Sequence, residues 1–215
     1  ITVSPDGKNI YVAISESPGW GLVYWRRNSA TGALTNQVNL RDTSSLKSPM
    51  GVTVSPDGGN VYAVDWQFDS ILYWDRNSAT GALTNQRKLI DLQNLIKPFA
   101  VTVSPDGNHV YAVASSANTI VCWDRNSATG DLTNQVNLQD SINLEGARNV
   151  AVSPDGNRVY VVSMEAQSIV YWDRNSNTGA LTNQESLVDS DLLQDPGSVA
   201  VSPDGKNIYA VAYRS

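Results

Sequence analysis

Aromatic rings and carboxylates occur close together at several points of the chain, for example where Trp66 and Phe68 alternate with Asp65 and Asp69. Aromatic rings stack on apolar faces and anchor protein interfaces, and carboxylates accept hydrogen bonds from hydroxyl groups. These residue types predict either a surface that binds a glycan or a protein, or loops that pack against one another or against further parts of the fold. The candidate ligand-binding residues are Trp20, Trp66, Phe68, Phe99, Met164, Tyr213, Asp65, Asp69, Glu165 and Arg148.

A second set of carboxylates, evenly spaced, could serve cation binding. Ca²⁺ needs six to eight oxygen ligands, and side chains about 49 residues apart in a repeat are expected to lie too far from one another to share an ion. Capping of turns is therefore the favoured role, and neither a metal site nor a cofactor is expected. The four residues are Asp42, Asp91, Asp140 and Asp189.

Groupings of residues typical of catalysis are missing from the sequence. It contains no phosphate-cradling loop, zinc-ligand spacing or Ser/His/Asp arrangement, so no catalytic residue is assigned. His109 is the only histidine, and we expect it to be a solvated turn residue because Asn60 and Arg158 take the same place elsewhere. Cys122 takes the place of a tyrosine and is expected to be a small buried apolar residue.

The elements that carry these residues form a repeat. Ser-Pro-Asp-Gly begins at Ser4, Ser55, Ser104, Ser153 and Ser202, with separations of 51, 49, 49 and 49 residues. A period of this length is typical of a propeller or another repeat architecture. Each unit contains four short segments rich in Val, Ile, Thr, Tyr and Trp, such as 51–55, 60–65, 70–76 and 83–91.

This pattern predicts an all-β fold, a β-propeller of four-stranded antiparallel blades of about 49 residues. We expect one domain over residues 1–215, with a partial last blade that holds only two strands. The chain starts at Ile1 rather than Met, and the incomplete blade leaves sheet edges open. We therefore expect a segment of a larger ring, or a ring closed by other chains; the remaining alternative is a self-contained ring of five blades, the last of them incomplete. The blades are predicted at 1–50, 51–99, 100–148, 149–197 and 198–215.

Sequence variation separates the two ends of this predicted propeller. The turns between the first and second strands, and between the third and fourth, are nearly identical in every unit, whereas the other connections differ. Ser-Pro-Asp-Gly suits a tight turn, because Pro fixes φ, Asp bonds to nearby amides and Gly accepts positive φ. The tetrapeptide is thus interpreted as structural. The repeated tyrosines and tryptophans, Tyr11 and Trp74 among them, are expected to fill the space between blades.

Composition limits the classes of partner. The chain has 215 residues, a net charge of -6 and an isoelectric point near 4.6. Nucleic-acid binding relies on clustered Lys and Arg, so we do not expect a chain with this net negative charge to bind nucleic acid. No apolar run approaches the roughly 20 residues that cross a bilayer, and membrane insertion is not expected. One cysteine permits no internal disulfide.

The string "VTVSPDG", the following "VYAV" and the turn "RNSATGALT" resemble the repeat of the YVTN and lactonase-like seven-bladed β-propellers. Trp74-Asp75 is similar to the closing dipeptide of WD40 repeats, although the Gly-His pair of that family is missing. The first resemblance implies enzymes that act through a few non-repeated polar residues near the mouth of the central channel. No such constellation can be mapped in this sequence.

The leading functional hypothesis is a non-catalytic binding module, extracellular, periplasmic or on a cell surface, whose variable connections contact a protein or glycan. The resemblance supplies a rival, hydrolysis of a sugar lactone, which rests on the analogy of fold alone. A third hypothesis is an architectural repeat of a surface protein or filament, with self-association through open blade edges.

Overall fold

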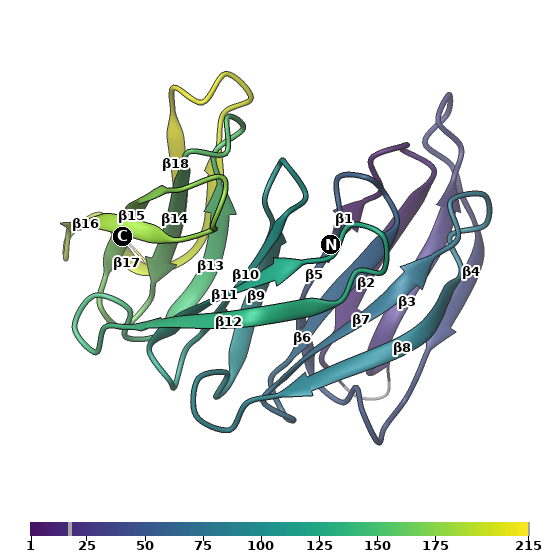
Figure 1. Cartoon of the computed structure of the whole chain (residues 1–215), viewed down its shortest axis with the longest axis horizontal. Helices are drawn as coiled ribbons and strands as arrows, with labels where there is room; N and C mark the ends of the chain where they lie inside the picture. Colours follow the sequence, from purple (N-terminus) through teal and green to yellow (C-terminus); the bar gives the residue numbers. More distant parts are fainter. Residues whose placement is uncertain (17–18, 215) are drawn as a thin grey trace.

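The structure, a computed structural model, describes residues 1–16 and 19–214, and within them it contains strands and turns without any helix. Figure 1 shows the strands gathered into successive sheets along the chain. Short runs of β-branched and aromatic residues between Pro, Gly and Asn explain why strands form here. Among the described residues, no helix could span a membrane.

Four sheets of four strands and one pair of strands make up the structure. The first blade contains β1 (Thr2–Val3), β2 (Asn9–Ile14), β3 (Gly21–Arg27) and β4 (Leu34–Leu40). The second contains β5 (Pro49–Val54), β6 (Asn60–Asp65), β7 (Ser70–Arg76) and β8 (Leu83–Ile90). The third contains β9 (Pro98–Val103), β10 (His109–Ala114), β11 (Thr119–Arg125) and β12 (Leu132–Gln139). The fourth contains β13 (Ala147–Val152), β14 (Arg158–Ser163), β15 (Ser168–Arg174) and β16 (Leu181–Val188). The pair, which begins a fifth, consists of β17 (Gln194–Val201) and β18 (Ile208–Arg214).

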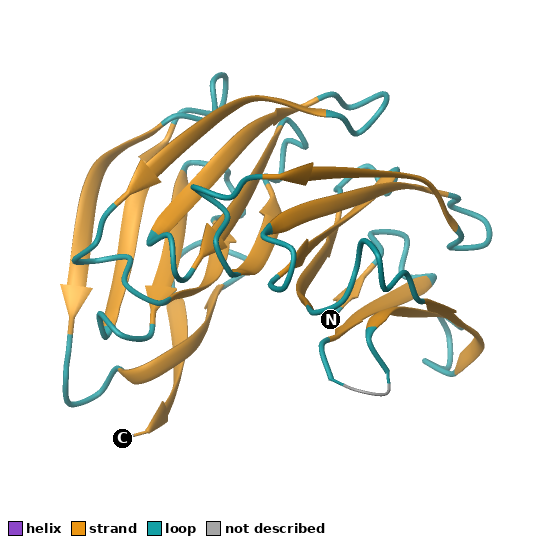
Figure 2. Ribbon diagram, turned by 90° about the horizontal axis from the view of Figure 1, so that it is seen from below, coloured by secondary structure: helices purple, strands orange, loops and turns teal. Residues whose placement is uncertain are grey.

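Each blade is a meander in which strands adjacent in sequence pair antiparallel. The first strands of successive blades, β1, β5, β9, β13 and β17, pack against one another. They therefore form the inner layer, and the fourth strands lie at the rim. Figure 2 shows the sheets fanned out, with the C-terminus at the lower left edge and the N-terminus nearer the middle of the view. This arrangement confirms the predicted propeller-like fold of four-stranded blades.

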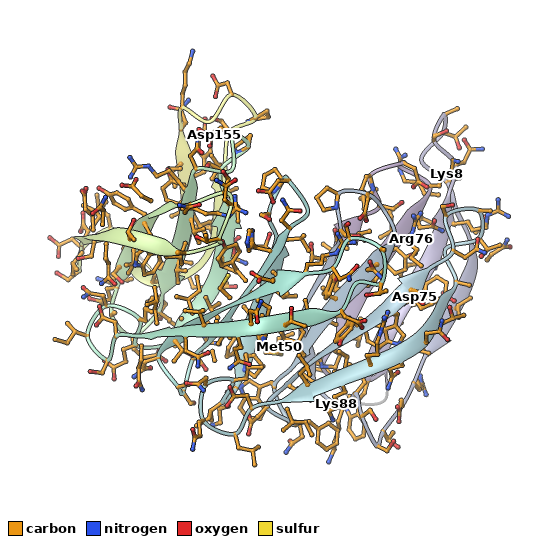
Figure 3. The ribbon with its side chains drawn as sticks, in the orientation of Figure 1. Lys8, Met50, Asp75, Arg76, Lys88 and Asp155 are labelled. Carbon is orange, nitrogen blue, oxygen red and sulfur yellow. The ribbon has the colours of Figure 1, made fainter. Side chains whose placement is uncertain are left out.

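The meander places the two classes of connection at opposite ends. The near-identical turns form one end, which we call the repetitive end, and the connections that differ form the variable end. In Figure 3, Lys8 and Asp155 from repetitive turns lie toward the top of the view, and Met50 and Lys88 lie toward the bottom. The side chains of the variable end thus share one face of the scaffold.

The Ser-Pro-Asp-Gly turn is structural, as predicted. In the third blade the Gly107 amide donates to the Ser104 carbonyl at 2.8 Å, which closes the turn. The Ser104 hydroxyl donates to Asp106 at 2.5 Å and accepts a bond from the His109 amide at 3.0 Å. The serine and aspartate side chains of the tetrapeptide are therefore bonded within the turn.

The turn aspartate also joins one blade to the next, which sequence comparison alone does not reveal. Arg125 of the third blade is fully buried and donates to Asp57 of the second at 2.7 Å. It also donates to Asn60 Oδ1 at 2.7 Å, to the Tyr62 hydroxyl at 2.8 Å and to the Gly107 carbonyl at 2.9 Å. Arg76 and Arg174 make the corresponding bonds at the other two interfaces.

The space between blades is filled by the repeated aromatic residues. Tyr62 and Trp123 belong to one apolar cluster that joins the second and third blades, and each is at most 1% exposed. Equivalent clusters join the first blade to the second and the third to the fourth. Tyr209 of β18 is 61% exposed, because no further blade covers it. The prediction that the repeated aromatic residues fill the space between blades is thus confirmed at the three interfaces between complete blades.

The prediction that His109 is solvated is wrong, because its side chain is only 3% exposed. Arg174 Nη2 lies 2.7 Å from His109 Nδ1, and a guanidinium can only donate, so Nδ1 is the acceptor. The neutral ring then carries its proton on Nε2, which lies 3.6 Å from Asp124. Burial and the charge of Arg174 both lower the pKa of His109. The histidine therefore replaces the asparagine that Arg125 contacts one blade earlier.

Acid is expected to destabilise this fold through the bonded aspartates. Burial acts to raise the pKa of Asp6, but hydrogen bonds from Ser4 and Arg76 outweigh it and lower the pKa to about 2. The hydrogen bond from Ser44 is the main cause that lowers the pKa of Asp42 to about 2. Each carboxylate therefore stabilises the folded state above its ordinary pKa of about 3.8, and this contribution is lost as the pH falls toward about 2.

Urea unfolding measured between about pH 5 and about pH 2 checks this, and the midpoint is expected to fall across that window. Asp6→Asn should show a smaller fall than the wild type, since one of the titrating groups is gone. A wild-type midpoint that stays constant across the window would contradict the prediction.

Candidate functional site

A cavity of about 490 Å³ opens at the variable end, above the inner strands of the propeller. We call it the mouth cavity. It is built from the starts of β5, β9 and β13, from the loops that precede β5 and β9, and from the loops that follow β2, β6, β10 and β14. Its lining residues are Ser15, Ser48, Met50, Trp66, Lys97, Phe99, Ser115, Ser116, Arg148 and Glu165.

Blade geometry explains why these residues meet. Met50, Phe99 and Arg148 hold equivalent places at the start of three successive inner strands, which pack side by side. Trp66 and Glu165 come from loops that follow the second strand of a blade. Residues about 49 or 98 positions apart in sequence are thereby brought to one opening. Four of the ten predicted ligand-binding residues line the cavity: Trp66, Phe99, Arg148 and Glu165.

Met50 also lines the cavity, although it does not belong to the predicted set. It holds the place in its blade that Phe99 and Arg148 hold in theirs. Their convergence follows from the ring, since equivalent positions of neighbouring blades face the same axis.

Cations cover the aromatic rings of the cavity. Lys97 Nζ lies 4.8 Å from the centre of the Trp66 ring, and the Arg148 guanidinium carbon lies 3.9 Å from the centre of the Phe99 ring. Such contacts hold a cation over a ring face by electrostatic attraction. The cavity therefore presents positive charge where sequence reasoning expected bare rings for stacking.

Arg148 has further capacity for hydrogen bonding. Its Nε is buried, and within the part of the chain that the structure describes it has no hydrogen-bond partner. A buried donor without a partner costs free energy, which an acceptor from a ligand or ordered water would recover. The guanidinium is thus suited to bind an oxygen atom in the cavity.

Among the described residues, Glu165 is the one carboxylate that lines the mouth cavity, and it is exposed. Its placement depends on Gly146, whose φ is +68°, because a Cβ on this glycine would lie 1.0 Å from Glu165 Oε2. Among residues 1–16 and 19–214, no lysine or arginine forms an ion pair with Glu165. The carboxylate is therefore open to a ligand or to water.

The charges of the cavity differ from those of the whole chain. Lys97, Arg148 and Glu165 give the lining a net charge of about +1 at neutral pH, whereas the chain carries -6. Four serine hydroxyls supply both donors and acceptors. This combination suits a polyhydroxylated ligand that carries a carbonyl, carboxylate or phosphate group.

Asp65 does not serve as a ligand-binding carboxylate, and this expectation is corrected. The residue is fully buried, and its Oδ2 accepts bonds from the amides of Lys47 and Ser48, both at 2.7 Å. Its Oδ1 accepts bonds from the amides of Gln67 and Phe68 at 3.0 and 2.9 Å. The carboxylate is therefore occupied in shaping two loops.

Other predicted residues lie at the variable end but outside the cavity. Lys88 Nζ lies 4.2 Å from the centre of the Phe68 ring, and Lys47 Nζ lies 5.9 Å from that of Trp20. Asp69 accepts a bond from the Lys97 amide at 2.8 Å and so supports a cavity residue. Met164 is half-buried.

Tyr213 lies on β18, outside the mouth cavity, and is 78% exposed. A Cβ on Gly197 would meet its ring at 2.2 Å, so the ring covers this glycine. Gly197 holds the place that Phe99 and Arg148 hold in earlier blades. In the earlier blades this place is filled by a side chain of the first strand, Phe99 or Arg148. In the fifth blade it is covered instead by Tyr213 of the second strand.

The four repeated aspartates cap turns, as predicted. Asp91 Oδ1 accepts bonds from the amides of Gln93 and Asn94, both at 2.9 Å. Its Oδ2 accepts a bond from Gln135 of the next blade at 2.6 Å. Within the described ranges, no three His, Cys, Asp or Glu side chains gather in a way that could hold a metal ion. The same turn bonds are made by Asp42, Asp140 and Asp189.

Sequence reasoning missed Lys97 and the four serines. A signal for Lys97 was available, because it precedes Phe99 by two residues and has the same place before its strand as Ser48. Its φ of +54° is unusual for a residue other than glycine. The serines gave no signal, because single serines in loops are common in any protein.

Comparison with known proteins bears on the fold. No protein-family model and no curated protein matches the sequence. A proposed 6-phosphogluconolactonase from Bacteroides fragilis has a TM-score of 0.74 at 17% identity, over 96% of this chain and 61% of that one. The periplasmic gluconolactonase of Pseudomonas aeruginosa has a TM-score of 0.74 at 17% identity, over 97% and 63%. A protein of unknown function from Desulfotomaculum acetoxidans has a TM-score of 0.73 at 18% identity, over 98% and 61%.

The chain spans about three fifths of the length of these proteins, as the 61% coverage of the first shows. The matches cover nearly all of this chain. Similarity at this level of identity concerns the backbone and carries no substrate with it. The chain has the β-propeller fold of lactonase-like proteins.

Proposed function

We propose that the chain binds the lactone of a sugar acid in the mouth cavity and hydrolyses it. The observation that carries the proposal is the meeting of Lys97, Arg148 and Glu165 in one open cavity of a lactonase-like propeller. Two cations and one free carboxylate supply the charges that ester hydrolysis requires. The serine hydroxyls suit the hydroxyl groups of the sugar.

Each of these residues has a separate role in the reaction. Water adds to the lactone carbonyl carbon while Glu165 accepts the proton that the water loses. Arg148 and Lys97 lie beside the cavity and stabilise the negative oxygen that forms on the carbonyl. The ring C–O bond then breaks, and the ring oxygen takes the proton back from Glu165. The product is the open hydroxy acid, and atoms and charge balance.

We expect the affinity of the mouth cavity for a lactone to depend on the charge of that lactone. The net positive lining favours a lactone that carries a phosphate over a neutral one, because charge-assisted bonds to Arg are stronger than neutral ones. Gluconolactone and its 6-phospho derivative are the matched pair to compare. The periplasmic neighbour also supports a location outside the cytoplasm, which we include in the proposal.

Acid release by the full chain, followed in a pH-stat above the uncatalysed rate, tests the proposal. We expect turnover of the phosphorylated lactone, and an increase of about tenfold in its KM for Arg148→Met. Lys206→Met, which removes an exposed lysine of the repetitive end, is the control and should leave KM unchanged. Hydrolysis of both lactones at the uncatalysed rate would refute the proposal.

Recognition without catalysis is the second candidate, and one observation favours it. Glu165 is the single acid among the described residues that line the cavity. The nearby Asp65 cannot act as a second one, because its carboxylate accepts hydrogen bonds from four backbone amides. In that case the same cavity would bind the sugar acid or a glycan without turnover. Calorimetric binding of gluconate 6-phosphate, lost in Arg148→Met and unaccompanied by lactone hydrolysis, would support this candidate over the first.

A further inference from the structure

One position of the third strand differs in a single blade. Tyr24, Tyr73 and Tyr171 hold it in the first, second and fourth blades, and Cys122 holds it in the third. Cys122 is 8% exposed, which confirms the predicted burial of this residue. The structure of the sister blades shows what the larger side chain does there.

In the first two blades the tyrosine ring fills the gap between one blade and the next. The ring centre of Tyr24 lies 5.5 Å from that of Tyr11, and that of Tyr73 lies 5.7 Å from that of Tyr62. Each hydroxyl group also lies near the backbone of the following blade, at Leu83 for Tyr24 and at Leu132 for Tyr73.

The third blade has a cavity in this region. It has a volume of about 110 Å³, and its lining is mainly apolar. Leu181 stands in the place of Leu83 and Leu132, and Tyr111, which pairs with Cys122 in the sheet, stands in the place of Tyr11 and Tyr62. The lining residues are Ile120, Cys122, Asp124, Asn134, Val136, Leu138, Thr178, Gly179, Ala180 and Leu181.

We infer that this cavity is a binding site for a neutral single-ring aromatic compound with one hydroxyl group, a phenol. The ring takes the place of the tyrosine ring that the sister blades carry, beside Tyr111, and the hydroxyl is directed to the Leu181 amide. The site is separate from the mouth cavity, since the two share no lining residue. The inference therefore stands independently of the proposed function.

The lining selects this class of ligand. An apolar cavity of about 150 Å³ in another protein binds benzene, so a volume of this order accommodates one ring. Among the described residues that line the cavity there is no lysine or arginine, and Asp124 is the one charged side chain. A carboxylate on the ring would be repelled by Asp124, and a charged amine would lose its hydration against the apolar wall. A neutral phenol avoids both costs.

The probe is p-cresol, which is the tyrosine side chain without its backbone. Titration of the full chain with p-cresol, followed by the change in melting temperature and by calorimetry, should give saturable binding. Cys122→Tyr should fill the cavity and weaken binding by at least about tenfold, whereas Cys122→Ala should retain it. Equal binding to wild type and Cys122→Tyr, or no saturable binding to wild type, would overturn the inference.

A second measurement uses only the wild-type chain, so it does not depend on the folding of a variant. Cys122 is the only cysteine, so alkylation of the chain reports on this cavity alone. Burial is the main cause that raises the pKa of its thiol to about 11, so alkylation is slow. The reaction should be followed over long times at about pH 8, where p-cresol stays neutral because a phenol ionises at about pH 10. p-Cresol at saturation should slow alkylation severalfold, while p-hydroxybenzoate should not. An alkylation rate that is indifferent to p-cresol would also overturn the inference.

Discussion

Replacement of Arg125 by alanine is expected to lower the free energy of unfolding by about 3 kcal/mol, because it removes one partner from a buried polar network. The guanidinium is fully buried and donates to the Tyr62 hydroxyl, Asn60 and the Gly107 carbonyl. Without it, these buried acceptors lose a donor that water cannot easily replace. Its bond to Asp57 contributes less, since that carboxylate is 42% exposed and screened by solvent.

The chain supplies a matched control for this substitution. Arg27 holds the same place in the first blade, but no preceding blade packs on it, and its side chain donates to the Gly7 carbonyl at 3.1 Å. Arg27→Ala is therefore expected to cost less than about 1 kcal/mol. Urea unfolding followed by tryptophan fluorescence measures both variants. Similar losses for the two would show that the contacts between blades do not carry the stability assigned to them.

Replacement of Glu165 by glutamine is expected to lower kcat for lactone hydrolysis by about a hundredfold or more, because the amide cannot accept the proton of the attacking water. Glutamine has nearly the same shape, so the loop beside Gly146 should keep its conformation. KM should change little, since the contacts that hold the ligand come from Lys97, Arg148 and the serines.

The control for this prediction is Glu145→Gln, which removes an exposed carboxylate of a neighbouring loop that does not line the mouth cavity. It should retain the kcat of the wild type. If Glu165→Gln also retained full kcat, another group would have to take the proton and the proposed role of Glu165 would be wrong. Binding of p-cresol near Cys122 should be the same in both variants, which separates the two sites experimentally.

The candidate site was predictable in part. Trp66, Phe99, Arg148 and Glu165 were recognised because each departs from the repeat at the variable end, and the structure places all four around the mouth cavity. Asp65 departs from the repeat as well, yet its carboxylate binds backbone amides. Residue type and position in a loop are local properties, whereas the direction of a side chain depends on what packs around it.

The sequence by itself determined the architecture of this protein. The 49-residue period, the turn residues and the short β-branched segments act locally, so each copy independently specifies the same four strands. Repetition of the turns also identified the end of the blades at which individual loops gather. The interpretation of Ser-Pro-Asp-Gly and of the repeated aromatic residues as structural followed from the same comparison.

Only the tertiary structure decided how one copy meets the next. Asp57 and Arg125 are 68 residues apart, and nothing local to either turn indicates that they pair. The burial of His109 and the space left beside Cys122 likewise arise at contacts between blades. The physical reason is that strands are specified by short-range sequence, while burial, charge pairing and cavities arise where separate strands pack together.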